Sequence, residues 1–468
     1  MNSVNWTLLL NSLLVAGAVA LLAVGLGFAV ALWLACLRGA ARGGLLAACI
    51  ATAALPPFLV VNSWIDLFGR TGSLHLWLPF ELYSFTGCVV LLTALFWPIA
   101  ALLIHAAWRQ ANPELWEADP ELRGFAFIRR LLWPQARTAL AQSAGLIFVL
   151  ALNQFSVPAI LQVRIYPEEL WVRFNTTFNH VEVLALSWPM VIFPLLLVAV
   201  LARHPINWPR GLRAGKTTEF RRQLGGGWWL LVGVIGSVVI LGSLVLPLGQ
   251  LLLAASTWSQ LSGAWAANSN TAIQSIVVAA VPALISVSLG WLLAPTRLGA
   301  LLWPVYFLPG VLLGIALIFL ANRKGLDWVY SSVAILFLAL TVRYLAPAWY
   351  GARLIRRGLD RDLVDAGRLS GAQGWQRWAL VDWPQARPQL LALGYVLYLL
   401  CLWDVETINL IVPAGSETLA LRIFNLLHYG HNGEVNALCL LLLGIALLPL
   451  VAGMIAVRLL SASKGEGR

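Results

Sequence analysis

Charged side chains are scarce in this sequence of 468 residues, where Asp, Glu, Lys and Arg together make up 11%. A soluble domain carries about a quarter of its residues as these four types, so the shortage excludes an ordinary soluble protein. Hydrophobic residues are abundant instead, at 60%, and the mean hydropathy is +0.82. The composition predicts an all-α polytopic membrane protein, because a helix satisfies its backbone hydrogen bonds within itself when lipid surrounds it.

Cysteine and histidine are also rare, with five and six residues respectively. The cysteines stand singly in hydrophobic runs without a C-x-x-C pair, and the histidines are scattered, so we expect no disulfide framework and no metal site. The segment 211–217 approaches a P-loop, but it has three residues between its glycines where the motif needs four. We expect no catalytic residues and no cofactor in this chain.

Hydrophobic runs of about 20 residues, the length that crosses a bilayer, recur along the chain. Five runs lie near 8–37, 45–68, 85–107, 138–160 and 181–202, and six more lie near 228–254, 270–294, 300–321, 329–350, 389–411 and 434–457. A polar segment at 203–226, rich in arginine, proline and glycine, separates the two groups. The sequence therefore predicts about 11 transmembrane helices in two halves, 1–202 with about five and 227–468 with about six, joined by a cytoplasmic linker.

An internal repeat supports the two halves. The pentapeptide Trp-Pro-Gln-Ala-Arg occurs at Trp133–Arg137 and again, 250 positions later, at Trp383–Arg387. Leu55-Pro56 and Leu308-Pro309 also stand at matching places in the two groups of runs. We interpret the halves as parallel repeats, related by a pseudo-two-fold axis along the membrane normal.

The stretch before the second copy carries the most specific motif. Asp365, Ala366 and Gly367 are followed by three residues and then Gly371, and nine further residues separate Gly371 from Val381–Pro384. This spacing resembles the EAA loop of the membrane subunits of binding-protein-dependent type I ABC importers, which reads Glu-Ala-Ala, three residues, Gly, nine residues and Ile-x-Leu-Pro. The segment 359–388 is thus similar to a loop on which an ATPase subunit docks.

Local chemistry predicts a short helix in this second loop. Asp360 is a suitable N-cap, Gly371 can take the left-handed conformation that ends a helix, and Pro384 interrupts the segment that follows. The first loop, 112–137, is a degenerate version in which Glu117, Ala118 and Gly124 precede Pro134 at shorter spacing.

The resemblance implies a fused permease, in which one chain supplies both membrane halves of the MetI-like fold. Permeases of this kind serve the uptake of ferric iron, thiamine and aminophosphonates. The resemblance further implies a bacterial inner membrane, a periplasmic or lipid-anchored substrate-binding protein, and two separate ATPase subunits that hold the ATP and Mg²⁺. The chain itself is then a transporter subunit and no enzyme.

Polar residues after each loop are candidates for the translocation pathway. Gln154 and Ser156 in the first half stand where Asp404 and Glu406 stand in the second, and ionisable groups at membrane depth usually face a cavity or a partner. The alternative is that the two carboxylates lie in water at the outer interface. If they line the pathway, they favour a cationic substrate such as ferric iron or thiamine.

Arg343 is the remaining charge within a hydrophobic run. We expect it to form a structural ion pair rather than to contact substrate, since an unpaired buried charge is costly. Asp404, Glu406 and Asp66 are all possible partners.

The net charge of +11 follows the positive-inside rule better than it indicates nucleic-acid binding, because no separate basic domain is present. With both repeat loops inside, 24 of the 31 lysines and arginines lie in cytoplasmic segments. This places the N-terminus in the periplasm and the C-terminus in the cytoplasm. A secondary transporter with parallel repeats and a membrane-embedded enzyme remain as alternatives; the first would need no docking loop, and the second would need converging His, Asp or Glu residues.

Overall fold

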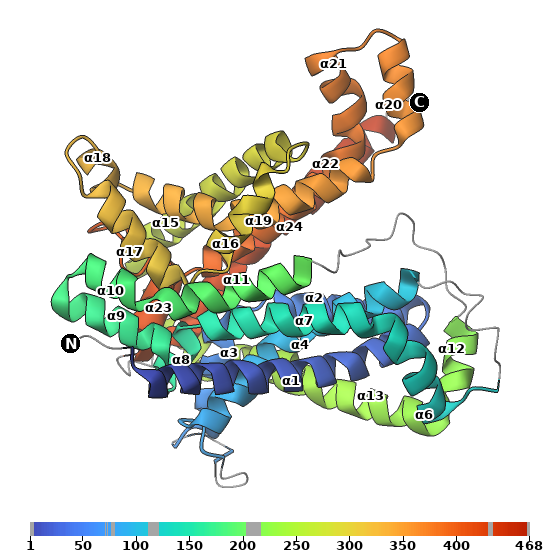
Figure 1. Cartoon of the computed structure of the whole chain (residues 1–468), viewed down its shortest axis with the longest axis horizontal. Helices are drawn as coiled ribbons and strands as arrows, with labels where there is room; N and C mark the ends of the chain where they lie inside the picture. Colours follow the sequence, from blue (N-terminus) through green and yellow to red (C-terminus); the bar gives the residue numbers. More distant parts are fainter. Residues whose placement is uncertain are drawn as a thin grey trace. The chain divides into compact units, whose positions relative to one another are not determined.

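The computed structural model describes residues 4–70, 72, 74–75, 80–110, 121–202, 217–428 and 434–465, and the regular structure of these residues is entirely helical. The expectation of an all-α polytopic membrane protein is confirmed. The chain forms two compact units, Met1–Ala254 and Ala255–Arg468, which are described one at a time below (Figure 1).

Unit 1 is built on three long helices, α1 (Trp6–Cys36), α4 (Phe85–Gln110) and α7 (Trp133–Asn153), each of which packs on the other two. The contact between α1 and α4 is close because Gly27 has no side chain. A Cβ at this position would lie 2.8 Å from the backbone nitrogen of Ala101. Small residues at helix contacts of this kind let backbones approach each other in membrane proteins.

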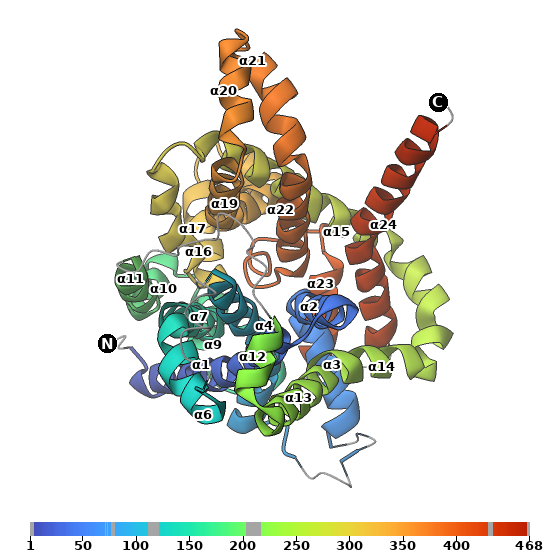
Figure 2. The same ribbon diagram turned by 90° about the vertical axis from the view of Figure 1, so that its right-hand side faces the viewer.

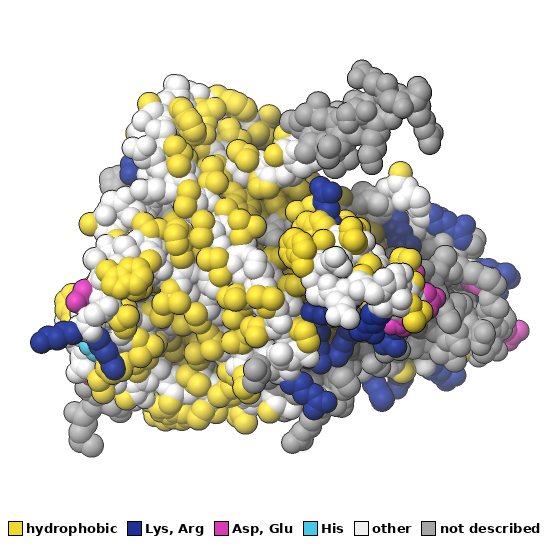
Figure 3. All heavy atoms as spheres, turned by 90° about the horizontal axis from the view of Figure 1, so that it is seen from above, with side chains coloured by type: hydrophobic (Ala, Val, Ile, Leu, Met, Phe, Trp, Pro, Cys, Tyr) yellow, Lys and Arg dark blue, Asp and Glu magenta, His cyan; other side chains and the backbone are white. Residues whose placement is uncertain are grey.

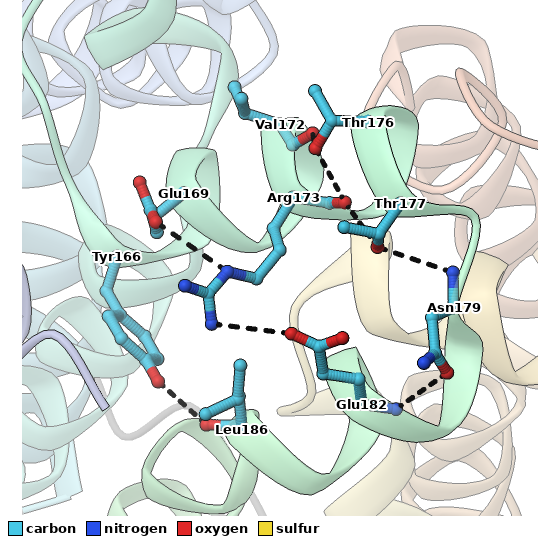
Figure 4. Close-up of polar contacts among 9 residues, drawn as sticks. All are labelled: Tyr166, Glu169, Val172, Arg173, Thr176, Thr177, Asn179, Glu182 and Leu186. Carbon is cyan, nitrogen blue, oxygen red and sulfur yellow. Dashed lines mark hydrogen bonds and ion pairs between the residues drawn. The ribbon is translucent and has the colours of Figure 1, made fainter. Parts of the chain in front are cut away.

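Apart from the segment that leads into α7, shorter helices complete the described part of unit 1 up to residue 202. They are α2 (Gly39–Ala53), α3 (Pro57–Phe68), α8 (Ser156–Ile160), α9 (Tyr166–Thr177), α10 (His180–Leu186) and α11 (Trp188–Ala202). Figure 4 shows how α9 is tied to α10: Arg173 lies 3.8 Å from Glu182 and 4.0 Å from Glu169, and Asn179 caps α10 by accepting from the backbone N–H of Glu182.

A broken helical segment that begins within the predicted linker, 203–226, also belongs to unit 1. It comprises α12 (Thr217–Leu224), α13 (Gly226–Ile240), η2 (Leu241–Val245) and α14 (Leu246–Leu253). Trp33 of α1 lies against Gly236, and Ser63 of α3 donates to the carbonyl of Pro247 at 3.1 Å. The sequence places this helix at the start of the second half, whereas its packing joins it to unit 1. Most of the linker, 203–216, lies outside the described residues.

Unit 2 repeats the three-helix plan with α15 (Ala255–Leu293), α19 (Ala334–Arg357) and α22 (Trp383–Trp403). Gly290 allows a close approach of α15 to α19, because a Cβ there would lie 2.7 Å from the carbonyl carbon of Ala348. The other helices of this core are η3 (Leu298–Leu302), α16 (Trp303–Tyr306), α17 (Gly310–Ala321), α18 (Asp327–Tyr330), α23 (Leu419–His428) and α24 (Val435–Gly465).

A helical loop protrudes from unit 2 between α19 and α22. It consists of α20 (Arg361–Leu369), α21 (Gly374–Arg377) and the π-helix η4 (Trp378–Asp382), and Figure 2 shows α20 and α21 projecting beyond the helices that carry them. This is the segment in which the sequence predicts the second docking loop.

Eight described helices are long and apolar enough to span a membrane, or nine if α2 and α3, which are bent by 93° relative to each other, count as one broken span. The two other runs expected from the sequence, 181–202 and 300–321, contain shorter apolar helices instead of single long ones. The face seen in Figure 3 carries a broad expanse of hydrophobic side chains, as a surface in contact with lipid requires.

Candidate functional site

The helix α20 begins and ends as its sequence predicts. The Asp360 side chain accepts from the backbone N–H of Asp362 at 2.9 Å, which caps the N-terminus. At the other end, Gly371 has φ +82°, its N–H donates to the carbonyl of Arg368, and the N–H of Ala372 donates to the carbonyl of Gly367, both at 3.0 Å. This pair of bonds is a Schellman motif, which needs a left-handed residue where Gly371 stands.

The two sides of α20 have different surroundings. Gly367 faces the base of the loop, where an added Cβ would lie 2.9 Å from a methyl group of Val381. Leu363 and Leu369 point outward and are 53% and 90% exposed, and no residue of α20 is buried. One side of this short amphipathic helix thus packs on unit 2, and the leucines on its other side are not covered by unit 2.

The two loops share one geometry at a separation of 250 residues. In unit 1, α6 (Gly124–Phe127) and the π-helix η1 (Ile128–Leu132) lead into α7, and α21 and η4 lead into α22 with identical lengths. Pro134 and Pro384 each stand in the first turn after the π-helix. A proline has no N–H for the preceding turn, and the wider π-turn accommodates it.

This geometry explains the irregular spacing of the first loop. Gly124 has φ +58° and Gly374 has φ +51°, so Gly124 is the structural counterpart of Gly374 and not of Gly371. The position equivalent to Gly371 is occupied by Glu121. The other predicted residues of the first loop, Glu117 and Ala118, lie outside the described residues.

Unit 1 covers the base of its loop with α12 and α13. Phe127 is fully buried with its ring 5.4 Å from that of Phe220, and Phe125 stacks on Trp228. At the equivalent place in unit 2, Trp375 stacks on Trp378 and is 73% exposed.

A buried charge cluster lies at the far end of α22 from the loop. The Arg343 guanidinium of α19 lies 3.2 Å from a carboxylate oxygen of Asp404 and 3.4 Å from one of Glu406, and it donates to the Thr407 hydroxyl at 2.8 Å. Asp404 also accepts from the Tyr344 hydroxyl and from the backbone N–H of Thr407, both at 2.8 Å. The Asp404 side chain is only 1% exposed.

The cluster identifies the partners of Arg343. Asp66, the third possible partner, instead accepts a hydrogen bond from Gln250 at 2.8 Å within unit 1. Asp404 and Glu406 are therefore buried against a cation inside unit 2 and are not exposed on its surface. Whether either also lines a translocation pathway stays a prediction.

Gln154 and Ser156 occupy the positions in unit 1 that Asp404 and Glu406 occupy in unit 2. Gln154 and Asp404 both end a 21-residue helix, with closely similar backbone angles of −68°, 113° and −73°, 104°. The Gln154 amide donates to the Ser156 hydroxyl at 2.6 Å, so a neutral hydrogen bond replaces the ionic cluster in unit 1.

Three members of the cluster escaped prediction. Thr407 and Tyr344 are adjacent in sequence to predicted residues, but neutral side chains in hydrophobic runs carry no signal of their own. Gly310, at the start of α17, leaves room for the cluster, since a Cβ there would collide with the Arg343 guanidinium. Its role follows from packing alone.

Apolar spans in two units, repeated three-helix cores and a pair of matched interhelical loops define a polytopic membrane protein built from two halves on one plan. The chain is similar to the ferric transport system permease protein FbpB of Actinobacillus pleuropneumoniae, with 23% identity over 473 residues that cover 91% of this chain and 68% of the relative. It is likewise similar to the thiamine transport system permease protein ThiP of Brucella abortus, with 24% identity over 413 residues, or 80% and 73% of the two chains.

A shorter match, 26% identical over 159 residues, relates 34% of this chain to 59% of the spermidine/putrescine transport system permease protein PotC of Escherichia coli. No protein-family model and no solved structure matches the chain. The relatives are permeases of ABC importers, so the expected resemblance of the chain to such permeases is confirmed. The assignment of the second loop as a docking loop stays a prediction.

Proposed function

We propose that this chain is the membrane-spanning subunit of an ABC importer, in which two separate ATPase subunits dock on the two loops and a substrate-binding protein delivers a small solute. The observation that carries this proposal is α20: a capped helix at the tip of a protruding loop, with Leu369 90% exposed. Burial of one leucine side chain contributes about 1.5–3 kcal/mol, so an exposed leucine on a rigid helix favours a partner with an apolar groove.

The attachment of α20 supports a role in transmitting motion. Gly367 of α20 lies close to Val381 of η4, and the Asp360 N–H donates to the Gln385 side chain of α22 at 2.9 Å, so α20 is joined to η4 and to the start of α22. A displacement of α20 is therefore passed to α22, which ends at the buried cluster around Asp404. ATP binding can shift the transporter between states only if the ATPase holds α20 differently in each.

The substrate, the location and the cofactor complete the proposal. Ferric iron and thiamine are the preferred substrates, because permeases named for them match most of this chain. The acidic pair no longer supports a cationic substrate, since Arg343 pairs with both Asp404 and Glu406. We place the chain in a bacterial inner membrane with its loops and C-terminus in the cytoplasm, and we assign ATP and Mg²⁺ to the ATPase subunits.

Co-purification tests the proposal. The chain is solubilised in detergent from its native host with everything bound to it, and the ATPase activity of the preparation is measured for wild type, Leu369→Ser and a control, Leu253→Ser. Leu253 is 86% exposed at the end of α14, far along the chain from either loop. We expect wild type and the control to retain an ATPase, and Leu369→Ser to lose it while remaining folded.

Two results would contradict the proposal. Retention of the ATPase by Leu369→Ser would remove α20 from the docking surface. A wild-type chain that purifies alone and moves solute along an ion gradient would replace the importer by a secondary transporter.

A further inference from the structure

A cavity of about 510 Å³ lies on the inner side of α20, within unit 2. It is bounded by the end of α15, the last turns of α19, the inner side of α20, and α21 with η4. Its lining residues are Ala294, Pro295, Arg353, Arg356, Arg357, Leu359, Arg361, Val364, Asp365, Arg368, Arg377 and Asp382. The outward leucines of α20 are not among them, so the cavity is separate from the proposed docking surface.

The cavity has a large excess of positive charge. Its two carboxylates are already paired, since Asp365 lies 3.1 Å from Arg368 and Asp382 lies 3.6 Å from Arg377. Four further arginines line it, at positions 353, 356, 357 and 361, and within the described part of the chain no carboxylate forms an ion pair with any of them. Cations gathered around one cavity repel one another unless an anion lies between them.

Aromatic rings hold two of these arginines in place. The Arg353 guanidinium lies 5.1 Å from the Trp349 ring, and the Arg356 guanidinium lies 5.1 Å from the Trp291 ring. Trp349 is fixed in turn, because its indole N–H donates to the carbonyl of Leu293 at 3.0 Å. Cation–π contacts leave the edge of a guanidinium free to donate hydrogen bonds, so these side chains are partly ordered before a ligand arrives.

We propose that this cavity binds a phosphate group. Arginine forks match phosphate oxygens in geometry and charge, and a space of this size accommodates a phosphate with its substituent. Two sources share this chemistry, the headgroup of an anionic phospholipid and a soluble phosphate compound. The lipid is favoured by position: the cavity opens where the apolar helices α15 and α19 end, and Ala294, Pro295 and Leu359 give it apolar walls beside the arginines.

A bound phosphate adds a link between α19 and α20, which are joined in sequence by residues 358–360. Arg357 belongs to the end of α19 and Arg361 to the start of α20, and a phosphate between them holds α20 against the membrane-spanning helices. The anion thereby sets the position of the loop, independently of what docks on its outer side.

The test uses the whole chain in detergent and native mass spectrometry. The chain is incubated in parallel with phosphatidylglycerol, cardiolipin, phosphatidylcholine and tripolyphosphate at equal concentrations, and bound ligand is counted. Arg357→Gln and Arg361→Gln are the test variants, because both side chains are exposed and, within the described structure, neither forms a hydrogen bond or an ion pair with another residue. Arg387→Gln is the control, since it removes one exposed arginine of α22 outside the cavity.

We expect wild type and Arg387→Gln to retain an anionic lipid but no phosphatidylcholine, and each test variant to bind that lipid about tenfold or more weakly, as the loss of a charged hydrogen bond predicts. Tripolyphosphate bound by wild type, lost in the test variants and not displaced by lipid would assign the site to a soluble phosphate compound. Equal lipid retention by wild type, Arg357→Gln and Arg361→Gln, with no tripolyphosphate bound, would overturn the proposal. Because ATPase docking is not measured here, the outcome is independent of the proposed transport function.

Discussion

Removal of the Asp404 carboxylate is the most direct test of the buried cluster. Asp404 receives the Arg343 guanidinium, the Tyr344 hydroxyl, and both the N–H and the hydroxyl of Thr407, all at 2.8–3.2 Å. Asp404→Ala leaves Arg343 with one remaining ion pair, to Glu406 at 3.4 Å. Breaking a buried ion pair by removing one partner costs about 3–5 kcal/mol of unfolding free energy. For a unit of this size the expected fall in Tm is roughly 6–20 °C.

The assay is thermal unfolding of the detergent-solubilised chain, followed by the fraction that remains monodisperse after heating. Gln154→Ala is the matched control, because Gln154 ends α7 as Asp404 ends α22 but makes one neutral hydrogen bond. Its loss costs about 0.5–1.5 kcal/mol. A double-mutant cycle of Asp404→Asn with Arg343→Met then measures the coupling, which we expect to be about 0.5–3 kcal/mol for residues in one network. An Asp404→Ala melt within the range of Gln154→Ala would refute the reasoning.

Three further predictions concern other parts of the chain. Gly371→Asp should abolish uptake of labelled substrate while the chain still folds and binds its substrate-binding protein, because a side chain at φ +82° distorts the end of α20; normal uptake would remove the coupling role. Gly310→Ala should lower the Tm by an amount equivalent to about 1–3 kcal/mol, since the added methyl group displaces Arg343, and an unchanged melt would count against this packing. Burial raises the pKa of Glu168 above its ordinary value of 4.5, so the folded chain keeps this proton to higher pH than the unfolded chain does. The free energy of unfolding therefore falls as the pH rises from 4.5 through the pKa of the folded state. The Tm of Glu168→Gln should therefore equal that of wild type at pH 4 and exceed it at pH 7. Equal Tm values for the two proteins at both pH values would contradict this.

Local features of the second loop could be predicted from sequence because each depends on neighbouring residues. The cap by Asp360, the left-handed Gly371 and the proline after η4 all follow from residue type and spacing. Gly124 was harder to place. Its counterpart in the second loop is Gly374, 250 positions later. The two glycines are related by their positive φ angles, which only the structure shows.

Long-range pairing could not be predicted. Arg343 is separated from Asp404 by 61 positions, and three carboxylates stood as possible partners on charge alone. The choice depends on how α19 and α22 pack, and on Gly310 leaving room between them. Pro56 and Pro57 mark a break between α2 and α3 in the sequence, but the angle of that break, 93°, depends on packing and could not be predicted.

The helix α13–α14 has a consequence for how the protein can be divided. Trp33 and Ser63 hold it in unit 1, although the chain reaches it only after the linker predicted at 203–226, and Ala254 then joins it directly to α15 of unit 2. A protease cut, or a gene split, within the linker would therefore produce two fragments that each contain part of unit 1. The second fragment would carry the helix that completes the packing of unit 1, and the two fragments would reassemble when that helix docks on α1 and α3 of the first.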